Sequence, residues 1–177
     1  MTTDESAKTY PVDFVLNGRR TRVDVDPRTL LADVIRHEAG LTGVKIACEQ
    51  GVCGSCTVLE NGLPIRSCIT LAVQVAGAEI ETVEAIAPSG ADLHPIQESF
   101  QREHGLQCGF CTPGMVLTTK ALLAENPDPD EQEIREYLSG NICRCTGYVG
   151  IVASVREAAR CARAASPTGA TTDSEGS

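Results

Sequence analysis

The stretch Cys48-Glu-Gln-Gly-Val-Cys53-Gly-Ser-Cys56 determines how the first half of the chain must fold, and Cys68 follows twelve positions later. The 177 residues include nine cysteines, and four of them belong to this set. Gly51 and Gly54 tolerate backbone angles that a side chain resists, so the segment can turn tightly with its N–H groups inward. Inward N–H groups stabilise a negatively charged, thiolate-bound centre. The stretch therefore predicts a loop folded around a metal site.

The spacing C-x4-C-x2-C with a distant fourth cysteine is typical of plant-type [2Fe–2S] proteins. It makes Cys48, Cys53, Cys56 and Cys68 the expected ligands of a first cluster. The alternative is zinc, but zinc ribbons usually carry paired C-x2-C knuckles. Because this set contains only one such pair, the spacing favours an iron–sulfur cluster.

A second set consists of Cys108-Gly-Phe-Cys111 and Cys143-Arg-Cys145, separated by 31 residues. Taken alone, these four thiols leave structural zinc open. Cys111 and Cys145 each precede a predicted helix start, where free N–H groups and the helix dipole stabilise thiolates. Beside the first set, the second predicts another [2Fe–2S] cluster, with Cys108, Cys111, Cys143 and Cys145 as ligands. Two clusters indicate a chain that carries single electrons.

The remaining candidate residues suggest no further chemistry. Cys161 lies on a predicted helix, where a lone cysteine is ordinarily a buried apolar thiol. His37, His94 and His104 have no paired spacing, and neither cysteine loop contains the histidine that a Rieske centre requires. We recognise no nucleotide, flavin or substrate motif and no catalytic residue in the sequence.

Local patterns predict the first structural unit. Apolar and polar residues alternate across 12–16, which indicates a half-buried strand. Asn17-Gly18 and Asn61-Gly62 each predict a two-residue hairpin turn. Between the hairpins, Thr29 is expected to cap a helix that ends near Gly40. These elements predict a β-grasp, ferredoxin-like unit.

Helical patterns follow a Pro/Ser/Gly-containing linker, with expected helix starts at Pro95, Thr112-Pro113, Asp128-Pro129 and near Tyr148. At the third start, Asp128 is the expected cap and Glu131 the acid of a capping box. The expected fold class is α+β, with a β-grasp ferredoxin-like domain followed by an all-α four-helix bundle. The expected organisation is disorder at 1–9, a ferredoxin-like domain at 10–84, a linker at 85–93, a helical domain at 94–165 and a disordered tail at 166–177.

Composition limits the function classes. Hydrophobic residues make up 42% of the chain, enough for a globular core, and the net charge is −9. Neither half is basic, which argues against nucleic-acid binding. The first ten residues lack the apolar region of a signal peptide, and no run approaches the ~18 apolar residues of a membrane span. We expect a cytoplasmic protein with reduced thiols, in which clustered cysteines bind metal.

Three longer motifs carry a family resemblance. They are Gly43-Val-Lys-Ile-Ala-Cys48-Glu-Gln-Gly-Val-Cys53-Gly-Ser-Cys56-Thr57, Gln107-Cys-Gly-Phe-Cys-Thr-Pro-Gly-Met115 and Gly140-Asn-Ile-Cys-Arg-Cys-Thr-Gly-Tyr148. In this order they resemble the iron–sulfur subunit of molybdenum hydroxylases, the family of xanthine dehydrogenase, aldehyde oxidoreductase and carbon monoxide dehydrogenase. The resemblance covers about residues 10–163 and departs at Ala47, where many relatives have glycine.

The resemblance implies the non-substrate-binding, electron-transfer subunit of a molybdenum-containing oxidoreductase. It implies a large partner subunit with a molybdenum–pterin cofactor and a medium subunit with FAD. Electrons would pass from molybdenum to the second cysteine set, then to the first set, then to FAD. By the same resemblance, Gln107 hydrogen-bonds the pterin and Cys145 lies against it. A free-standing ferredoxin would need only the first set, and a zinc-stabilised interaction module would be colourless. The substrate of the complex is not encoded in this chain.

Overall fold

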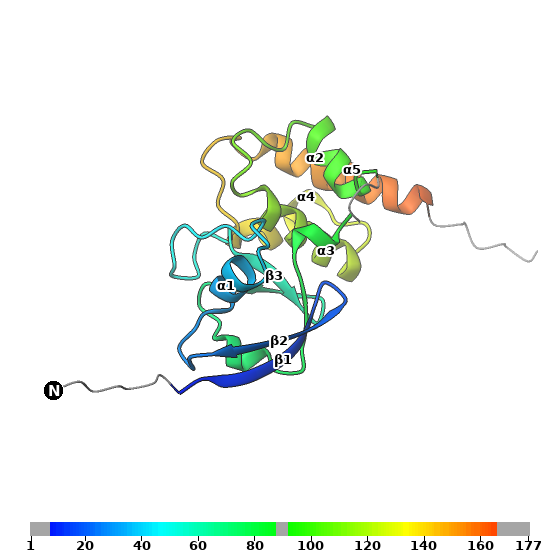
Figure 1. Cartoon of the computed structure of the whole chain (residues 1–177). Coiled ribbons are helices and arrows are strands. Elements are labelled where there is room, and N and C mark those ends of the chain that lie inside the picture. Colours follow the sequence, from blue (N-terminus) through cyan, green and yellow to red (C-terminus); the bar gives the residue numbers. More distant parts are fainter. Residues whose placement is uncertain (1–7, 88–91, 166–177) are drawn as a thin grey trace, which may run out of the picture.

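The structure is a computed structural model that describes residues 8–87 and 92–165 (Figure 1). The predicted tail at 166–177, most of the predicted disordered segment at 1–9, and residues 88–91 of the predicted linker lie outside the described residues. In Figure 1 the strands β1 and β2 lie at one end of the molecule, and the helices α2 and α5 lie at the other.

The N-terminal unit is built on a mixed five-stranded sheet. Its strands are β1 (Tyr10–Leu16), β2 (Arg19–Val25), β3 (Thr57–Glu60), β4 (Leu63–Arg66) and β5 (Glu79–Glu81). The strand order is β2-β1-β5-β3-β4, with β1 and β5 parallel and the other pairs antiparallel. Both predicted hairpin turns are confirmed, since Asn17, Gly18, Asn61 and Gly62 all adopt positive φ angles.

The helical segment that follows β2 differs from the expected capped helix. It consists of a single turn, α1 (Leu31–Asp33), continued by a π-helical turn, η1 (Val34–Glu38). The residue at the N-cap is Leu30, which has no capping side chain, so the expected Thr29 cap is wrong. The segment is held instead by the burial of Leu31 and Ile35, and Gly40 ends it with φ +68° as expected. Two 3₁₀ turns, η2 (Ala72–Val75) and η3 (Val83–Ala85), flank β5.

Four α-helices form the C-terminal unit, which confirms the α+β class. They are α2 (Pro95–Arg102), α3 (Thr112–Glu125), α4 (Glu131–Tyr137, extended by the 3₁₀ turn η4, Leu138–Gly140) and α5 (Val149–Ala165). The proline starts of α2 and α3 are confirmed. The α4 cap is corrected by two residues: the Asp130 carboxylate accepts from the Glu133 N–H at 2.8 Å, and the Glu133 carboxylate accepts from the Asp130 N–H at 2.7 Å. The Asp128 N–H instead donates to the Asn126 side chain in the preceding turn.

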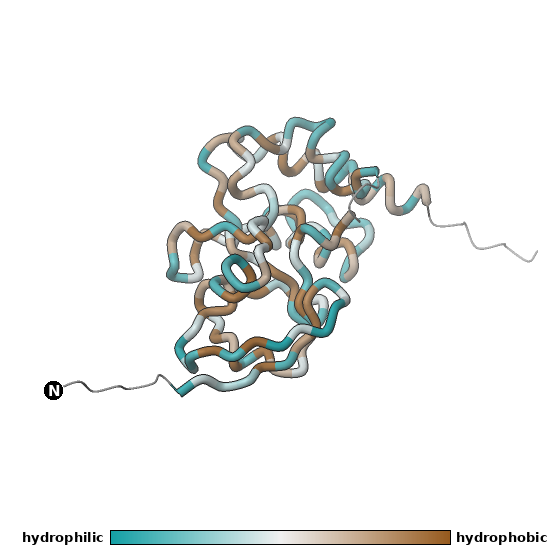
Figure 2. The backbone as a smooth tube through the Cα atoms, in the orientation of Figure 1, coloured by the Kyte–Doolittle hydropathy of each residue, from teal (hydrophilic) through white to brown (hydrophobic). Residues whose placement is uncertain are grey.

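Two hydrophobic cores meet at strand β3. Val58 packs in the core between the sheet and the α1 segment, whereas its neighbour Leu59 packs in the core of the helical unit. Figure 2 shows hydrophobic colouring at β3, alternating hydrophobic and hydrophilic colouring along the helices, and hydrophilic colouring at the β1–β2 turn. None of the helices described for residues 8–87 and 92–165 has both the length and the apolar character that crossing a bilayer requires.

Candidate metal centres

The first cysteine set lies in a loop between η1 and β3, with Cys68 just beyond β4. The backbone N–H groups of Gln50 and Cys53 each donate to the Cys48 Sγ at 3.4 Å. These two donors, followed by contact with the Cys53 side chain, lower the pKa of the Cys48 thiol to about 6. The loop is therefore shaped to favour a thiolate, as the positive φ angles of Gly51 and Gly54 allow.

The other half of the first set is buried. Cys56 and Cys68 are 2% and 4% exposed. Burial, and then contact with the Cys56 side chain, raise the pKa of the Cys68 thiol to about 11. Two thiols pressed together in this way cannot both ionise cheaply without a cationic centre between them. This is the situation that a thiolate-bound metal resolves.

The second set is assembled from the loop before α3 and the loop before α5. The Sγ atoms of Cys108 and Cys145 lie 3.6 Å apart, and both residues are exposed. Cys111 and Cys143 form the inner pair, in which burial and the Cys143 contact raise the pKa of Cys111 to about 12. Burial opposes ionisation of Cys143 too, but the hydroxyl and N–H of Thr146 donate to its Sγ and lower its pKa overall.

The C-x-C loop of the second set is closed by its own aromatic residue. The Tyr148 hydroxyl accepts from the Cys143 N–H at 2.9 Å, and the Tyr148 N–H donates to the Thr146 hydroxyl at 3.1 Å. Tyr148 adopts φ +69°, an angle that a bulky residue rarely takes. This strained angle indicates that the contacts around the cysteines, rather than the backbone preference of Tyr148, determine the shape of the loop.

Within each set the thiols form two close pairs. The contacts pair Cys48 with Cys53, Cys56 with Cys68, Cys111 with Cys143, and Cys108 with Cys145. Sulfurs that share one tetrahedral metal with ~2.3 Å bonds lie about 3.8 Å apart, so the 3.6 Å separation of Cys108 and Cys145 fits one shared metal atom. Within the described part of the chain, no three His, Cys, Asp or Glu side chains are placed to hold a single metal ion. Paired sulfurs suit a two-metal group, which takes two ligands at each metal.

The residues around the second set are exposed and partly apolar. Gln107, directly before Cys108, is exposed, as is Cys145. Phe110 and Ile142, which lie within or beside the two loops, remain 43% and 46% exposed. An exposed apolar surface at a thiol pair is typical of a surface that another protein covers.

The remaining candidate residues lie apart from both sets. Cys161 is only partly buried, and its thiol lies 3.6 Å from a Glu157 carboxylate oxygen, so the expectation of a buried thiol is wrong. His94 is structural, since its Nδ1 accepts from the Ile96 N–H and caps α2.

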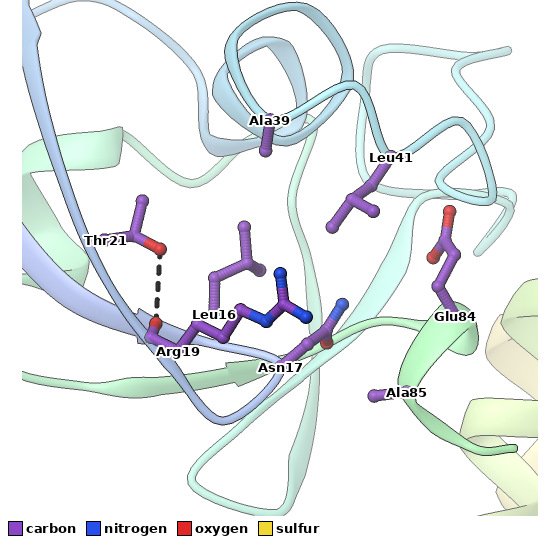
Figure 3. A pocket seen from close by; sticks show the side chains of 8 residues that line it. All are labelled: Leu16, Asn17, Arg19, Thr21, Ala39, Leu41, Glu84 and Ala85. Carbon is purple, nitrogen blue, oxygen red and sulfur yellow. Dashed lines mark hydrogen bonds between the residues drawn. The ribbon is translucent and has the colours of Figure 1, made fainter. Parts of the chain in front are cut away.

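One sizeable pocket of the N-terminal unit has no part in the cysteine sites. Figure 3 shows it beside the β1–β2 turn, where Thr21 donates to the Arg19 carbonyl. Its volume is about 600 Å³, and it is lined by Leu16, Asn17, Arg19, Thr21, Ala39, Leu41, Glu84 and Ala85. Because no cysteine lines it, the pocket and the thiol pairs are separate features.

No local sequence pattern predicts the contacts that join the two cysteine loops. The Ile142 N–H donates to the Cys53 carbonyl at 2.8 Å. Asn141, 2% exposed, donates through its side chain to the Gly54 carbonyl at 3.3 Å. Residues almost ninety positions apart thus place the two thiol sets against each other.

Comparisons with known proteins agree with this geometry. The family described as "2Fe-2S iron-sulfur cluster binding domain" matches residues 14–81, and the family described as "[2Fe-2S] binding domain" matches residues 82–156. Each cysteine set therefore lies inside a matched [2Fe–2S] domain.

The full-length relatives are subunits of larger enzymes. The chain is 50% identical over 158 residues to the nicotine 6-hydroxylase small subunit of Paenarthrobacter nicotinovorans, covering 89% of this chain and 94% of that relative. It is 47% identical over 150 residues to the caffeine dehydrogenase subunit gamma of a Pseudomonas species (strain CBB1), covering 83% and 89%. Among solved structures, quinoline 2-oxidoreductase from Pseudomonas putida 86 superposes with a TM-score of 0.85 at 51% identity, covering 89% of this chain and 98% of that one.

Proposed function

The chain belongs to the iron–sulfur small subunits of the molybdenum hydroxylases, which transfer electrons within heteromeric complexes, and on this basis we propose which cysteines bind its clusters. We also propose the direction in which electrons pass through the chain and the partner subunits that it contacts. Cys48, Cys53, Cys56 and Cys68 ligate one [2Fe–2S] cluster, and Cys108, Cys111, Cys143 and Cys145 ligate the other. Each cluster, when bound, accepts and releases one electron. The chain's own residues hold the two clusters at a fixed separation.

The pairing of the thiols is the observation that supports this ligand assignment. The 3.6 Å separation of the Cys108 and Cys145 sulfurs and the N–H groups directed at the Cys48 sulfur suit thiolates bound to iron. The test is metal analysis of anaerobically purified protein, with two irons and two labile sulfides expected for each set. Stoichiometric zinc in a colourless protein would reject the assignment and favour the zinc-stabilised module. Replacing Cys161 with Ser should leave the iron content unchanged.

The electron path runs through the chain from the helical site to the ferredoxin-like site. The chain receives electrons at the exposed Cys108/Cys145 pair from a large molybdenum–pterin subunit, and it delivers them from the first site to FAD in a medium subunit. Its exposed thiol pair and the apolar side chains beside it support the helical site as the entry point. The substrate belongs to the large subunit.

Rapid-mixing spectroscopy of the assembled complex tests this order. Cys53→Ser should block flavin reduction while substrate still reduces the helical cluster, and Cys161→Ser should permit both steps. Normal flavin reduction in the Cys53→Ser complex would mean that electrons bypass the first site or travel the other way.

Gln107 and Cys145 form the contact with the pterin of the large subunit. The Gln107 amide offers a donor and an acceptor together, and it is exposed directly before a ligand cysteine. Gln107→Leu should leave both clusters assembled but cost about 1–3 kcal/mol of cofactor binding, because buried pterin groups lose their partners. Molybdenum content and single-turnover reduction of the helical cluster are the measurements, and Gln132→Leu on the exposed face of α4 is the matched control. If Gln107→Leu behaves like the control, Gln107 is an ordinary surface residue.

A further inference from the structure

Arg66 lies between the two cysteine sites. It is the last residue of β4, two positions before Cys68. Its Nη1 donates to the Thr57 hydroxyl at 2.7 Å, directly after Cys56 in the chain. Its Nη2 donates to the Gly140 carbonyl at 2.8 Å and to the Asn141 side-chain oxygen at 3.3 Å, just before Cys143. One guanidinium therefore bonds to segments that adjoin both cysteine sets.

The surroundings fix the guanidinium in place. A Cβ on Gly140 would lie only 2.5 Å from the Arg66 Nη2, so the glycine lets the guanidinium approach the loop closely. Asn141 accepts from the Thr118 hydroxyl at 3.2 Å and is buried, which holds the amide oxygen on the Arg66 side. The guanidinium is thus closely packed against Gly140 and hydrogen-bonded to a buried amide.

The charge of Arg66 has no carboxylate partner. It donates to a hydroxyl, a backbone carbonyl and an amide oxygen, all of them neutral. Among the described residues, no Asp or Glu oxygen lies within 4.0 Å of it, whereas Arg102, Arg135 and Arg160 each pair with a carboxylate. A half-buried cation without a counter-ion is costly. Cys68, a ligand in the proposed function, follows Arg66 by two positions, and Thr57 and Asn141, to which Arg66 donates, lie within two positions of Cys56 and Cys143.

We propose that Arg66 is a positioning residue whose fixed positive charge, held between the two iron–sulfur sites, raises the reduction potential of the clusters. The proposal rests on the proposed function, since it assumes that both cysteine sets hold [2Fe–2S] clusters. Reduction adds one electron, and therefore one negative charge, to a site that is already anionic. A nearby cation, here the Arg66 guanidinium, stabilises that reduced form.

Four variants of the assembled complex separate charge from hydrogen bonding. Arg66→Gln removes the charge and keeps an amide donor, and Asn141→Asp neutralises the charge in place with a nearly isosteric carboxylate. Arg66→Lys keeps the charge but loses the pair of Nη groups that donate to separate partners. Arg22→Gln removes the same charge from β2, where Arg22 is exposed and pairs with Asp13.

The measurement is a redox titration of both clusters followed by electron paramagnetic resonance. In Arg66→Gln and Asn141→Asp we expect lower midpoint potentials, on the order of a tenfold shift in the reduction equilibrium for a partly screened unit charge. Arg66→Lys and Arg22→Gln should stay near the wild type. Unchanged potentials in whichever of the first two variants retains its clusters would overturn the proposal. Loss of clusters in all three variants at Arg66 and Asn141, Arg66→Lys included, would also overturn it and assign Arg66 a purely structural role.

Cluster loss confined to the two charge-removing variants, with Arg66→Lys intact, would support the requirement for charge. The wild-type spectrum distinguishes failure of this proposal from failure of the cluster assignment. If the wild-type complex lacks two [2Fe–2S] signals, the proposed function itself is wrong.

Discussion

Gly54→Ala probes the contact between the two cysteine loops. Gly54 has φ +73°, and a Cβ there would lie 2.4 Å from the Gly140 carbonyl oxygen and 2.8 Å from the Asn141 side chain. The left-handed backbone costs alanine about 1–2 kcal/mol, and forcing an extra methyl against backbone costs about 1–3 kcal/mol more. Gly77→Ala is the matched control, because Gly77 has φ +78° and open space around its would-be Cβ.

The assay compares thermal unfolding midpoints of the two variants by circular dichroism on cluster-loaded protein. Both variants should lose stability because alanine disfavours the left-handed backbone. Gly54→Ala should lose about 1–3 kcal/mol more, which lowers its midpoint by roughly 2–12 °C relative to Gly77→Ala for a chain of this size. Gly54→Ala should also change the visible spectrum of the first cluster, which Gly77→Ala should leave unchanged. Equal midpoints and unchanged spectra would refute the claim that the loops touch through Gly54.

Three further predictions concern caps, pH and iron. Asp130→Ala should cost about 1 kcal/mol because it removes the α4 cap, whereas Asp128→Ala should cost under about 0.5 kcal/mol; denaturant unfolding compares them. Burial, then Lys120, lowers the pKa of His94 below its ordinary value of 6.5. As the pH falls, His94 is therefore protonated in the unfolded chain before it is protonated in the folded chain. Stability is therefore full above about pH 6.5 and falls with pH towards the folded-state pKa; His94→Asn should flatten this dependence in thermal melts and His37→Asn should not. Removing iron with a chelator should increase hydrogen exchange in the helix-free loop at 41–56 earlier than in strands β1 and β2. An equal increase in the loop and in the strands would contradict this.

The parts of the fold and site that sequence predicts are the locally determined ones. Asn-Gly hairpins, proline helix starts and closely spaced cysteines each depend on a few adjacent residues, and the structure contains the predicted turns and helices. The α4 cap was misplaced because the sequence fits a capping box twice, at Asp128 with Glu131 and at Asp130 with Glu133. The structure forms the second box, at the start of a helix that buries Ile134. The local pattern fits both boxes and does not by itself choose between them.

The contacts between the cysteine sites could not be predicted in this way. Arg66 and Asn141 are ordinary polar residues in sequence, and their pairing depends on how two separately patterned units dock. The positive φ of Glu49 and Tyr148 is likewise imposed by the loops, because neither residue favours that angle. The sequence predicts which thiols are ligands, and long-range packing determines how their loops are joined.

Strand β3 limits how this subunit can be recombined with its relatives. Val58 belongs to one hydrophobic core and Leu59 to the other, so a single strand serves as the shared wall of both units. A chimera spliced within 85–93 would divide the chain in sequence but would leave Leu59 of one parent packing against helices of the other. One unit can therefore be exchanged only with a parent whose helical core accommodates the same side chain at that position. The position of the crossover has to follow the packing of β3 rather than the order of the units along the chain.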